Sequence, residues 1–193
     1  MTGFPGLENG YALKECLGKG GSGVVLKVAR LGDGKEFAVK VIPKQKASTA
    51  SSRRALVREV QILMDCNHDG VVKFQDLIED GKYIYIVLEL IPGGDLYSVL
   101  KERKEGLCEA EALTVAERIL TSLVYLHKRG IAHRDIKLEN VMLASSKLDS
   151  VKLIDFGLAH RASDVTFSDN CTEFCGTLQY CAPEICIKKS YNP

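Results

Sequence analysis

Three glycines between two strand-like runs place the strongest constraint on how this chain can fold. Gly18, Gly20 and Gly23 form a Gly-x-Gly-x-x-Gly pattern. In a dinucleotide-binding fold such glycines have to open a helix, but here residues 24–29 are rich in β-branched side chains and predict a strand. The pattern therefore indicates a glycine-rich hairpin, which is either a phosphate-binding loop with accessible backbone amides or a flexible surface turn.

The first half of the chain predicts a sheet and one helix. Strand-like runs lie at residues 11–17, 24–29, 36–42, 71–78 and 82–90, and Asp-Gly turns at 33–34 and 80–81 join two pairs of them. Residues 53–65 carry apolar side chains at helical spacing. Lys40 lies between apolar residues in the third run, where a lysine is a solvated surface residue unless an anion lies beside it.

The second half predicts one long helix and fewer strands. Residues 110–127 form an amphipathic helix that Gly130 ends, and residues 141–143 and 151–154 form two short strands. Residues 159–180 are polar and loop-like, and the Ile-Pro-Gly-Gly stretch at 91–94 links the two halves. These elements predict an α+β protein.

The composition is that of an ordinary globular protein of 193 residues, with 46% hydrophobic and 26% charged residues and a net charge of +1. This balance favours neither a nucleic-acid nor a membrane partner, and the longest apolar stretch, residues 84–88, is far shorter than the ~18 residues of a membrane span. The N-terminus lacks a basic region followed by an apolar one, so a cytoplasmic or nuclear location is expected. The seven cysteines include no Cys-x-x-Cys pair and are interpreted as reduced thiols rather than a zinc site.

The residues best suited to catalysis gather at 133–140, His-Arg-Asp-Ile-Lys-Leu-Glu-Asn. Asp135 can accept the proton of an attacking hydroxyl, and Lys137 can neutralise a moving phosphate. Asn140 can offer an amide oxygen to a hard cation such as Mg²⁺. This combination indicates phosphoryl transfer.

Residues 133–140 resemble the catalytic loop of the eukaryotic protein kinases, and the other motifs of that family follow in the expected order. Lys40 lies in a strand after the glycine pattern, an Asp-Phe-Gly triplet stands at 155–157, and an Ala-Pro-Glu triplet stands at 182–184. The resemblance covers the chain from about Tyr11 onward.

The resemblance implies an α+β, two-lobed kinase fold. Its N-lobe, residues 11–90, would hold a five-stranded antiparallel sheet and one helix, after an N-terminal extension at residues 1–10. Residues 91–94 would form the hinge, and residues 95–193 would form a mainly helical, incomplete C-lobe.

The resemblance also implies a site for ATP and Mg²⁺. Lys40 would hold the α- and β-phosphates, and an ion pair with Glu59 on the expected helix would fix the lysine. The Glu89 carbonyl and the Ile91 amide would bond adenine, and Asp95 would contact ribose. The implied ATP-binding residues are Leu17, Gly18, Gly20, Gly23, Val25, Ala38, Lys40, Glu59, Glu89, Ile91, Asp95, Met142 and Asp155, and the implied metal ligands are Asn140 and Asp155.

Residues 159–180 correspond to the activation segment, which in this family normally carries the activating phosphate. Arg134 is the residue implied to hold that phosphate. Glu173 occupies the usual phosphothreonine position, so we hypothesise partial activity without phosphorylation. Thr172 is the competing phosphosite, and a solvated Glu173 without a role is the alternative. The Thr177 hydroxyl is implied to support the catalytic aspartate and lysine.

Lys137, two places after Asp135, and Thr177 resemble serine/threonine kinases. Glu139 corresponds to a position that binds a basic residue upstream of the target hydroxyl. The chain therefore looks most like the calmodulin-dependent group and is expected to act on a protein substrate.

The chain stops at Pro193, where the family continues into further helices. Two functions stay open at this point. One is a serine/threonine kinase that uses ATP and Mg²⁺, and the other is a catalytically impaired, truncated kinase that acts as a nucleotide- or partner-binding module. The complete catalytic set favours the first.

Overall fold

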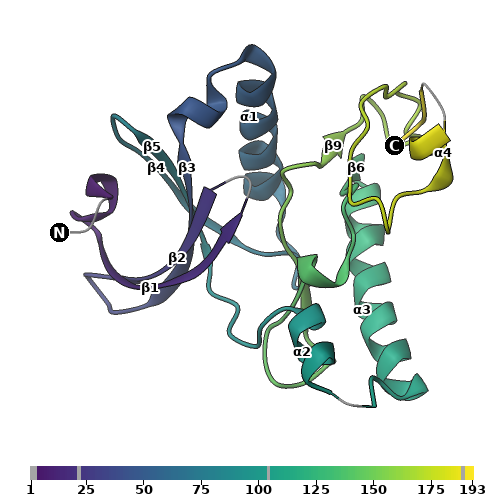
Figure 1. Ribbon diagram of the computed structural model, residues 1–193, viewed down its shortest axis with the longest axis horizontal. Coiled ribbons are helices and arrows are strands. Elements are labelled where there is room, and N and C mark those ends of the chain that lie inside the picture. The colour runs from purple at the N-terminus through teal and green to yellow at the C-terminus, as the bar shows by residue number, and fades with distance from the viewer. Residues whose placement is uncertain (1–3, 21–22, 104, 188–189) are drawn as a thin grey trace. The chain divides into compact units, whose positions relative to one another are not determined.

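The computed structural model describes residues 4–20, 23–103, 105–187 and 190–193 (Figure 1). The chain divides into two compact units. The first comprises Met1–Val60 and Lys73–Leu90, and the second comprises Gln61–Val72 and Ile91–Pro193. The α+β class predicted from the sequence is confirmed, because the first unit is built on a sheet and the second has the longest helix.

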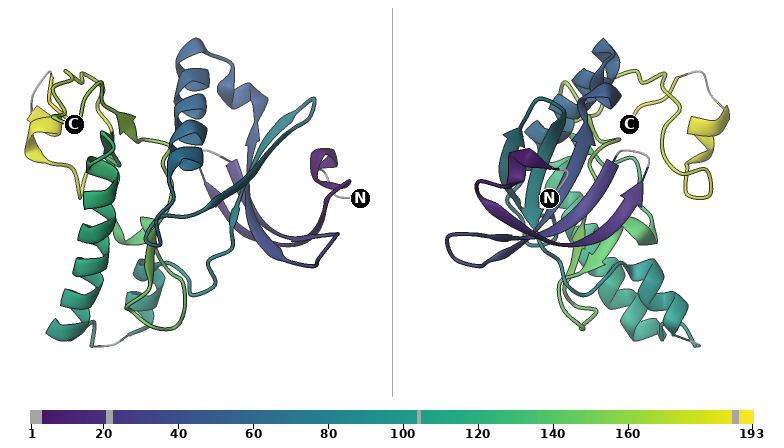
Figure 2. Two further views of the ribbon diagram at one scale, coloured as in Figure 1. Left: turned by 180° about the vertical axis from the view of Figure 1, so that it is seen from behind. Right: turned by 60° about the vertical axis from the view of Figure 1, so that its left-hand side comes forward.

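The first unit contains the predicted five-stranded antiparallel sheet, with neighbouring strands in the order β1-β2-β3-β5-β4 (Figure 2). The strands are β1 (Tyr11–Gly20), β2 (Gly23–Arg30), β3 (Glu36–Pro43), β4 (Phe74–Glu79) and β5 (Tyr83–Glu89). Successive side chains of a strand point to opposite faces of the sheet, so one face can be buried while the other is not.

The core of the first unit lies on one face of this sheet. Val39 of β3 is paired with Val87 of β5, and both are fully buried together with Val28 and Tyr85. A short 3-10 helix, η1 (Pro5–Leu7), inserts Leu7 into the same core ahead of β1. The N-terminal extension is therefore part of the packing of this unit.

Helix α1 (Ala50–Asp65) follows β3 after the 3-10 helix η2 (Lys44–Ala47). It begins before residue 53, where the apolar spacing placed its start. The Thr49 hydroxyl explains the earlier start, because it accepts a hydrogen bond from the Ser52 amide at 3.0 Å and so caps an otherwise unpaired N–H group.

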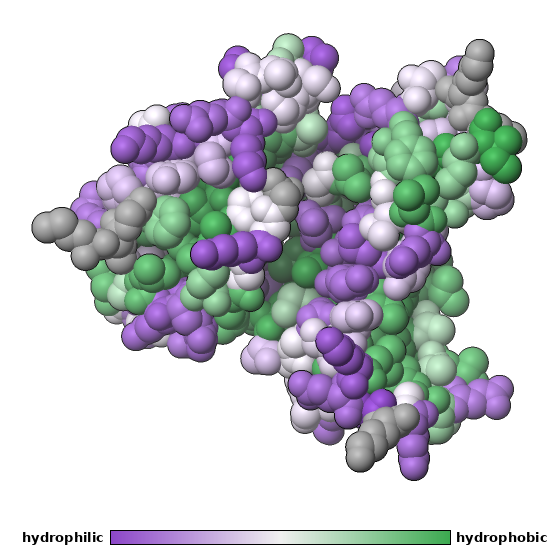
Figure 3. Space-filling view, viewed as in Figure 1, coloured by the Kyte–Doolittle hydropathy of each residue, from purple (hydrophilic) through white to green (hydrophobic). Residues whose placement is uncertain are grey.

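The second unit is organised around the long helix α3. Its elements are α2 (Leu96–Glu102), α3 (Glu109–His127), β6 (Ile131–Ala132), η3 (Leu138–Asn140), β7 (Val141–Leu143), β8 (Val151–Leu153), β9 (His160–Arg161) and α4 (Pro183–Ile187). β6 pairs with β9, and β7 pairs with β8. Helix α3 buries Val115 and Leu126, whereas Leu113, Leu120 and Val124 are exposed and add to an apolar surface along the helix (Figure 3).

The apolar pattern of residues 71–78 predicted one strand, but these residues do not form one. Val71 forms a parallel bridge with Leu153, and the Val72 amide donates to the Leu153 carbonyl at 3.0 Å. These residues therefore belong to the second unit, and β4 begins only at Phe74.

Helix α2, helix α4 and the strands β6 and β9 were not predicted from the sequence. The pattern of α2 was detectable at its start, because the Asp95 carboxylate accepts from the Ser98 amide at 2.8 Å and caps the helix. Strands β6 and β9 have two residues each, which is too short to show a periodic pattern.

Within the described part of the chain, no helix combines the length and the apolar character that a membrane crossing requires.

Candidate active site

A buried histidine, His133, holds the start of residues 133–140 in place. The Asp135 amide donates to His133 Nδ1 at 3.3 Å, so Nε2 carries the ring proton and donates it to the Ile154 carbonyl at 2.9 Å. Burial lowers the pKa of His133, which keeps the ring neutral and suits this tautomer. The ring also lies 4.9 Å from that of Phe156, measured between centroids.

The Asp135 carboxylate lies at the centre of a network of hydrogen bonds. Its Oδ1 accepts from the Thr177 hydroxyl at 2.8 Å, and its Oδ2 accepts from Asn140 Nδ2 at 2.9 Å. Lys137 Nζ lies 2.9 Å from Oδ2 and also donates to Thr177 Oγ1 at 2.9 Å. The structure thus brings together four residues that the sequence analysis selected.

This network fixes the charge state of the site. Burial would raise the pKa of Asp135, but hydrogen bonds from Lys137, Thr177 and Asn140 outweigh it and hold that pKa below its usual value. The hydrogen bond to Asp135 raises the pKa of Lys137. At neutral pH the pair is therefore a carboxylate and an ammonium, which is the state needed to accept a proton and to neutralise a phosphate.

A glycine lets the activation segment approach the catalytic loop closely. Gly176 has a φ of +96°, a conformation that residues with a side chain rarely adopt. A Cβ atom at this position would lie 2.8 Å from the Arg134 carbonyl oxygen. The close approach places Thr177, the next residue, against Asp135.

Asn140 and Asp155 are the residues suited to a hard cation. Asn140 donates through its amide nitrogen, to the Asp135 carbonyl and carboxylate, so those bonds do not use its amide oxygen. The Ile154 amide donates to the backbone carbonyl of Asn140 at 3.0 Å. This bond joins the residue just before Asp155 to Asn140. Asp155 itself has a φ of +59° at the turn after β8.

One carboxylate and one amide oxygen fit Mg²⁺, which usually binds through one or two carboxylates plus substrate phosphates and water. Among the described residues, no group of three or more His, Cys, Asp or Glu side chains is placed to hold a metal. A cation at Asn140 and Asp155 would therefore depend on ligands that a bound nucleotide brings.

In the first unit, Lys40 and Glu59 form a buried ion pair. Lys40 Nζ lies 2.6 Å from Glu59 Oε1, and the two side chains are only 12% and 8% exposed. Lys40 lies in the middle of β3, opposite Val25 of β2 and Ile86 of β5. The sheet and α1 thus hold the lysine that the family pattern assigns to phosphate binding.

The glycine-rich hairpin is described except for residues 21–22, which lie outside the described part of the chain. Gly18 and Gly20 have open space where a side chain would point, so local packing does not require glycine there. At Gly23, a Cβ atom would lie 2.1 Å from the Val41 carbonyl oxygen. The third glycine therefore has a packing role in the sheet.

The other proposed nucleotide-binding residues lie in both units. Leu17 is exposed at the end of β1, and Ala38 pairs with Leu88 in the sheet. The side chain of Glu89 accepts from the Lys73 amide at 2.8 Å, whereas the adenine contact predicted from the sequence would use the backbone carbonyl of Glu89.

In the second unit, Ile91 is buried and Asp95 forms a bridge with Met142. Both oxygens of Asp95 accept hydrogen bonds from Ser98, at 2.8 Å from the amide and 2.7 Å from the hydroxyl. Asp95 therefore has a structural role as a helix cap, which the sequence analysis did not recognise.

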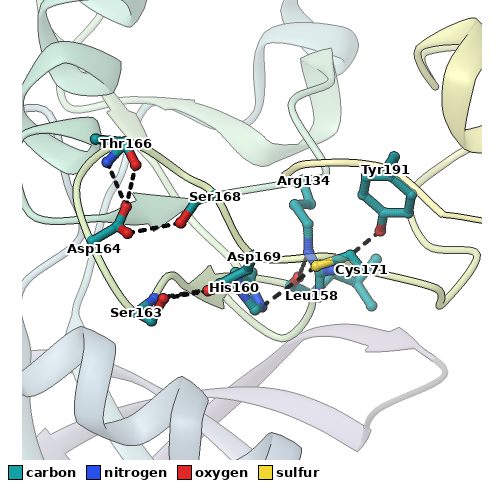
Figure 4. Close-up of polar contacts among 10 residues, drawn as sticks. All are labelled: Arg134, Leu158, His160, Ser163, Asp164, Thr166, Ser168, Asp169, Cys171 and Tyr191. Atoms are coloured by element: carbon teal, nitrogen blue, oxygen red, sulfur yellow. Dashed lines mark hydrogen bonds and ion pairs between the residues drawn. The ribbon is translucent and has the colours of Figure 1, made fainter.

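Arg134 contacts the backbone and a tyrosine of the second unit. Its Nε donates to the Leu158 carbonyl at 2.8 Å, and its Nη1 donates to the Tyr191 hydroxyl at 3.2 Å (Figure 4). Among the described residues, no cation pairs with the Glu173 carboxylate, which is exposed like Thr172. The structure therefore does not bring Arg134 and the Glu173 side chain together; only the Glu173 carbonyl takes part, as an acceptor from Tyr191 at 2.9 Å.

Two carboxylates shape the first part of the activation segment (Figure 4). Asp169 bonds His160 Nε2 at 2.7 Å and accepts from the Ser163 amide at 2.9 Å. Asp164 accepts from the Thr166 amide at 2.8 Å. Residues 160–169 are thus tied together by local polar contacts, within the stretch that the sequence predicts only as loop-like.

Comparison with known proteins decides the family. Residues 11–193 match the protein kinase domain. The chain belongs to the protein kinase domain family. Members of this family use ATP and a divalent metal ion and act on proteins, so the resemblance noted in the sequence is confirmed at this level.

Similar curated proteins are named as serine/threonine or calmodulin-dependent kinases. The chain is 36% identical over 187 residues to the probable serine/threonine-protein kinase fhkC of Dictyostelium discoideum, covering 95% of this kinase chain and 30% of the relative. It is 37% identical over 183 residues to a probable myosin light chain kinase of the same organism, covering 95% and 56%. It is 38% identical over 186 residues to calcium/calmodulin-dependent protein kinase type II of Caenorhabditis elegans, covering 96% and 25%. The chain thus spans between a quarter and somewhat over half of the length of these relatives.

Proposed function

We propose that this kinase domain transfers the γ-phosphate of ATP to a serine or threonine hydroxyl of a protein, with Asp135 as the general base. The observation that carries the proposal is the network in which Thr177, Lys137 and Asn140 all bond the Asp135 carboxylate. A binding module would need no such arrangement around a single ionised carboxylate.

Each residue of the network has a task in this reaction. Asp135 accepts the proton of the attacking hydroxyl, and the network holds the carboxylate in place for it. Lys137 neutralises charge on the transferred phosphoryl group. Asn140 and Asp155 would hold Mg²⁺, which neutralises phosphate charge when bound.

Lys40 binds the nucleotide phosphates in this proposal. A free lysine side chain samples many rotamers, and the 2.6 Å contact with Glu59 restricts them. The position of Glu59 on α1 makes the placement of this helix a possible control point for activity.

The preference for serine or threonine is supported by Lys137 and Thr177, which bond each other at 2.9 Å. Glu139 is exposed beside them and supplies a carboxylate for a basic residue upstream of the target hydroxyl. We therefore propose a basic serine- or threonine-containing peptide as the substrate class.

The test is phosphorylation of a basic serine peptide in the presence of ATP and Mg²⁺, beside the same peptide with the serine replaced by tyrosine or by alanine. We expect phosphate only on the serine peptide, and none when the metal is chelated. ATP binding is measured separately by calorimetry. Bound ATP with no phosphorylated peptide would contradict the proposal and support a nucleotide-binding module instead.

A further inference from the structure

Tyr191 is the centre of a small core in the second unit. It is buried together with Cys171 and Cys175, and Ile185 packs against them. The backbone of Tyr191 pairs with that of Cys171 through two hydrogen bonds of 2.8 Å. The end of the chain is therefore fastened to the activation segment at this point.

The Tyr191 hydroxyl makes three polar contacts. It donates to the Glu173 carbonyl at 2.9 Å. It accepts from Arg134 Nη1 at 3.2 Å (Figure 4). Cys175 Sγ lies 3.1 Å from the same oxygen. Because the phenol has one proton and gives it to Glu173, the thiol is the donor in this third contact. Burial raises the pKa of Tyr191 to about 12, so the hydroxyl keeps its proton at physiological pH.

These contacts reach both parts of the chain that hold Asp135. Arg134 directly precedes Asp135 in the catalytic loop. On the other side, Cys175 lies just before Thr177, whose hydroxyl donates to Asp135 at 2.8 Å. The single oxygen atom of Tyr191 thus connects the catalytic loop to the segment that carries Thr177.

A tyrosine is not needed here for packing alone. The Tyr191 side chain packs with Cys171, Cys175 and Ile185, and a phenylalanine ring would fill the same space. If packing were the only role of Tyr191, its hydroxyl would be a buried polar group that does not stabilise the core. Its three contacts indicate a separate task.

We propose that Tyr191 is a positioning residue for the phosphoryl transfer: its hydroxyl holds Arg134 and residues 173–175 together and so keeps Thr177 against Asp135 without a phosphate on the activation segment. This inference rests on the proposed kinase function. It assigns to the Tyr191 hydroxyl, together with the Glu173 backbone, the part that the sequence analysis gave to the Glu173 side chain.

The test compares Tyr191→Phe with Tyr125→Phe in the full chain. Tyr125 is a matched control, because its hydroxyl also forms a hydrogen bond with the backbone, accepting from the Asn67 amide at 2.7 Å, and that bond lies in the same unit but outside residues 159–180. For Tyr191→Phe we expect kcat to fall about tenfold, the effect of losing one hydrogen bond to a charged group, with the KM for ATP within about twofold of wild type. Tyr125→Phe should keep kcat within about twofold.

Amide hydrogen exchange of residues 171–177 gives a second readout that does not require activity. It should accelerate at least about tenfold in Tyr191→Phe and stay unchanged in Tyr125→Phe. An unchanged kcat in Tyr191→Phe, or an equal fall in both variants, would overturn the inference while leaving the kinase proposal intact. If the wild type itself transfers no phosphate, the kinase proposal fails, and unchanged exchange in Tyr191→Phe would overturn the structural role as well.

Discussion

Replacing Thr177 by valine tests the network around Asp135 most locally. Valine has nearly the same shape as threonine but lacks the hydroxyl that donates to Asp135 Oδ1 at 2.8 Å and accepts from Lys137 Nζ at 2.9 Å. The backbone at Thr177 and the close approach of Gly176 to the catalytic loop are left as they are.

The expected loss follows from what remains. A hydrogen bond to a charged group contributes about 1.5–3 kcal/mol. Asp135 keeps its bonds to Lys137 and Asn140 in the variant, so the carboxylate is still paired and the loss should lie near the lower end of that range. A loss of about 1.5 kcal/mol in the transition state corresponds to a fall in kcat on the order of tenfold.

The assay is steady-state phosphorylation of the basic serine peptide, with Thr177→Ser as the control that restores the hydroxyl. We expect Thr177→Ser to stay within about threefold of wild type. The Thr177 bond helps to lower the pKa of Asp135, so its removal raises that pKa and moves the acid limb of kcat/KM to higher pH. If the valine variant matched the serine variant in kcat and in pH profile, the proposed support of Asp135 by Thr177 would be wrong.

Three further changes give separate tests. Glu59→Gln removes the charge of a buried carboxylate that lies 2.6 Å from Lys40 Nζ, so the free energy of unfolding should fall by about 2 kcal/mol and the KM for ATP should rise, and an unchanged urea midpoint would argue against a stabilising role of the pair. At Asp80, burial would raise the pKa, but the hydrogen bonds that it accepts lower it to about 2. Its folded-state pKa is therefore below the ~3.9 of an unfolded chain, so its stabilisation is present above pH ~4 and is lost as the pH falls toward 2. Asp80→Asn should flatten the acid unfolding curve in that window. Gly176→Ala should cost about 1–2 kcal/mol and lower kcat, because φ is +96°, whereas Gly32→Ala, with open space at its Cβ position, should do neither.

The parts of the fold that local pattern governs were predictable. Four of the five strands in the first unit follow strand-like runs of the sequence close to the predicted bounds. The start of β4 was not predictable, because Val71 and Val72 have the composition of a strand but bond Leu153, which lies far away in the sequence. Hydrophobic pattern identifies a segment that can be buried but does not identify its partner.

The candidate site shows the same division. Asp135, Lys137 and Asn140 lie within one short stretch, so their types and spacing alone predicted a common site. The structure places all three in one network. Tyr191 bonds Arg134 across 57 positions, and nothing in a tyrosine near an Ala-Pro-Glu triplet indicates such a contact. Glu173 was chosen for its charge, whereas its backbone carbonyl makes the contact, and a sequence does not distinguish these two uses.

The rate of phosphoryl transfer by Asp135→Asn, measured against wild type at saturating ATP, Mg²⁺ and peptide, tests the central claim most directly. Asparagine has nearly the same shape and its amide oxygen can still accept from Lys137, but the amide cannot take the proton of the attacking hydroxyl. If Asp135 is the general base, kcat should fall by a factor on the order of 10²–10⁴ while ATP binding persists. A variant that transfers phosphate at the wild-type rate would contradict the account.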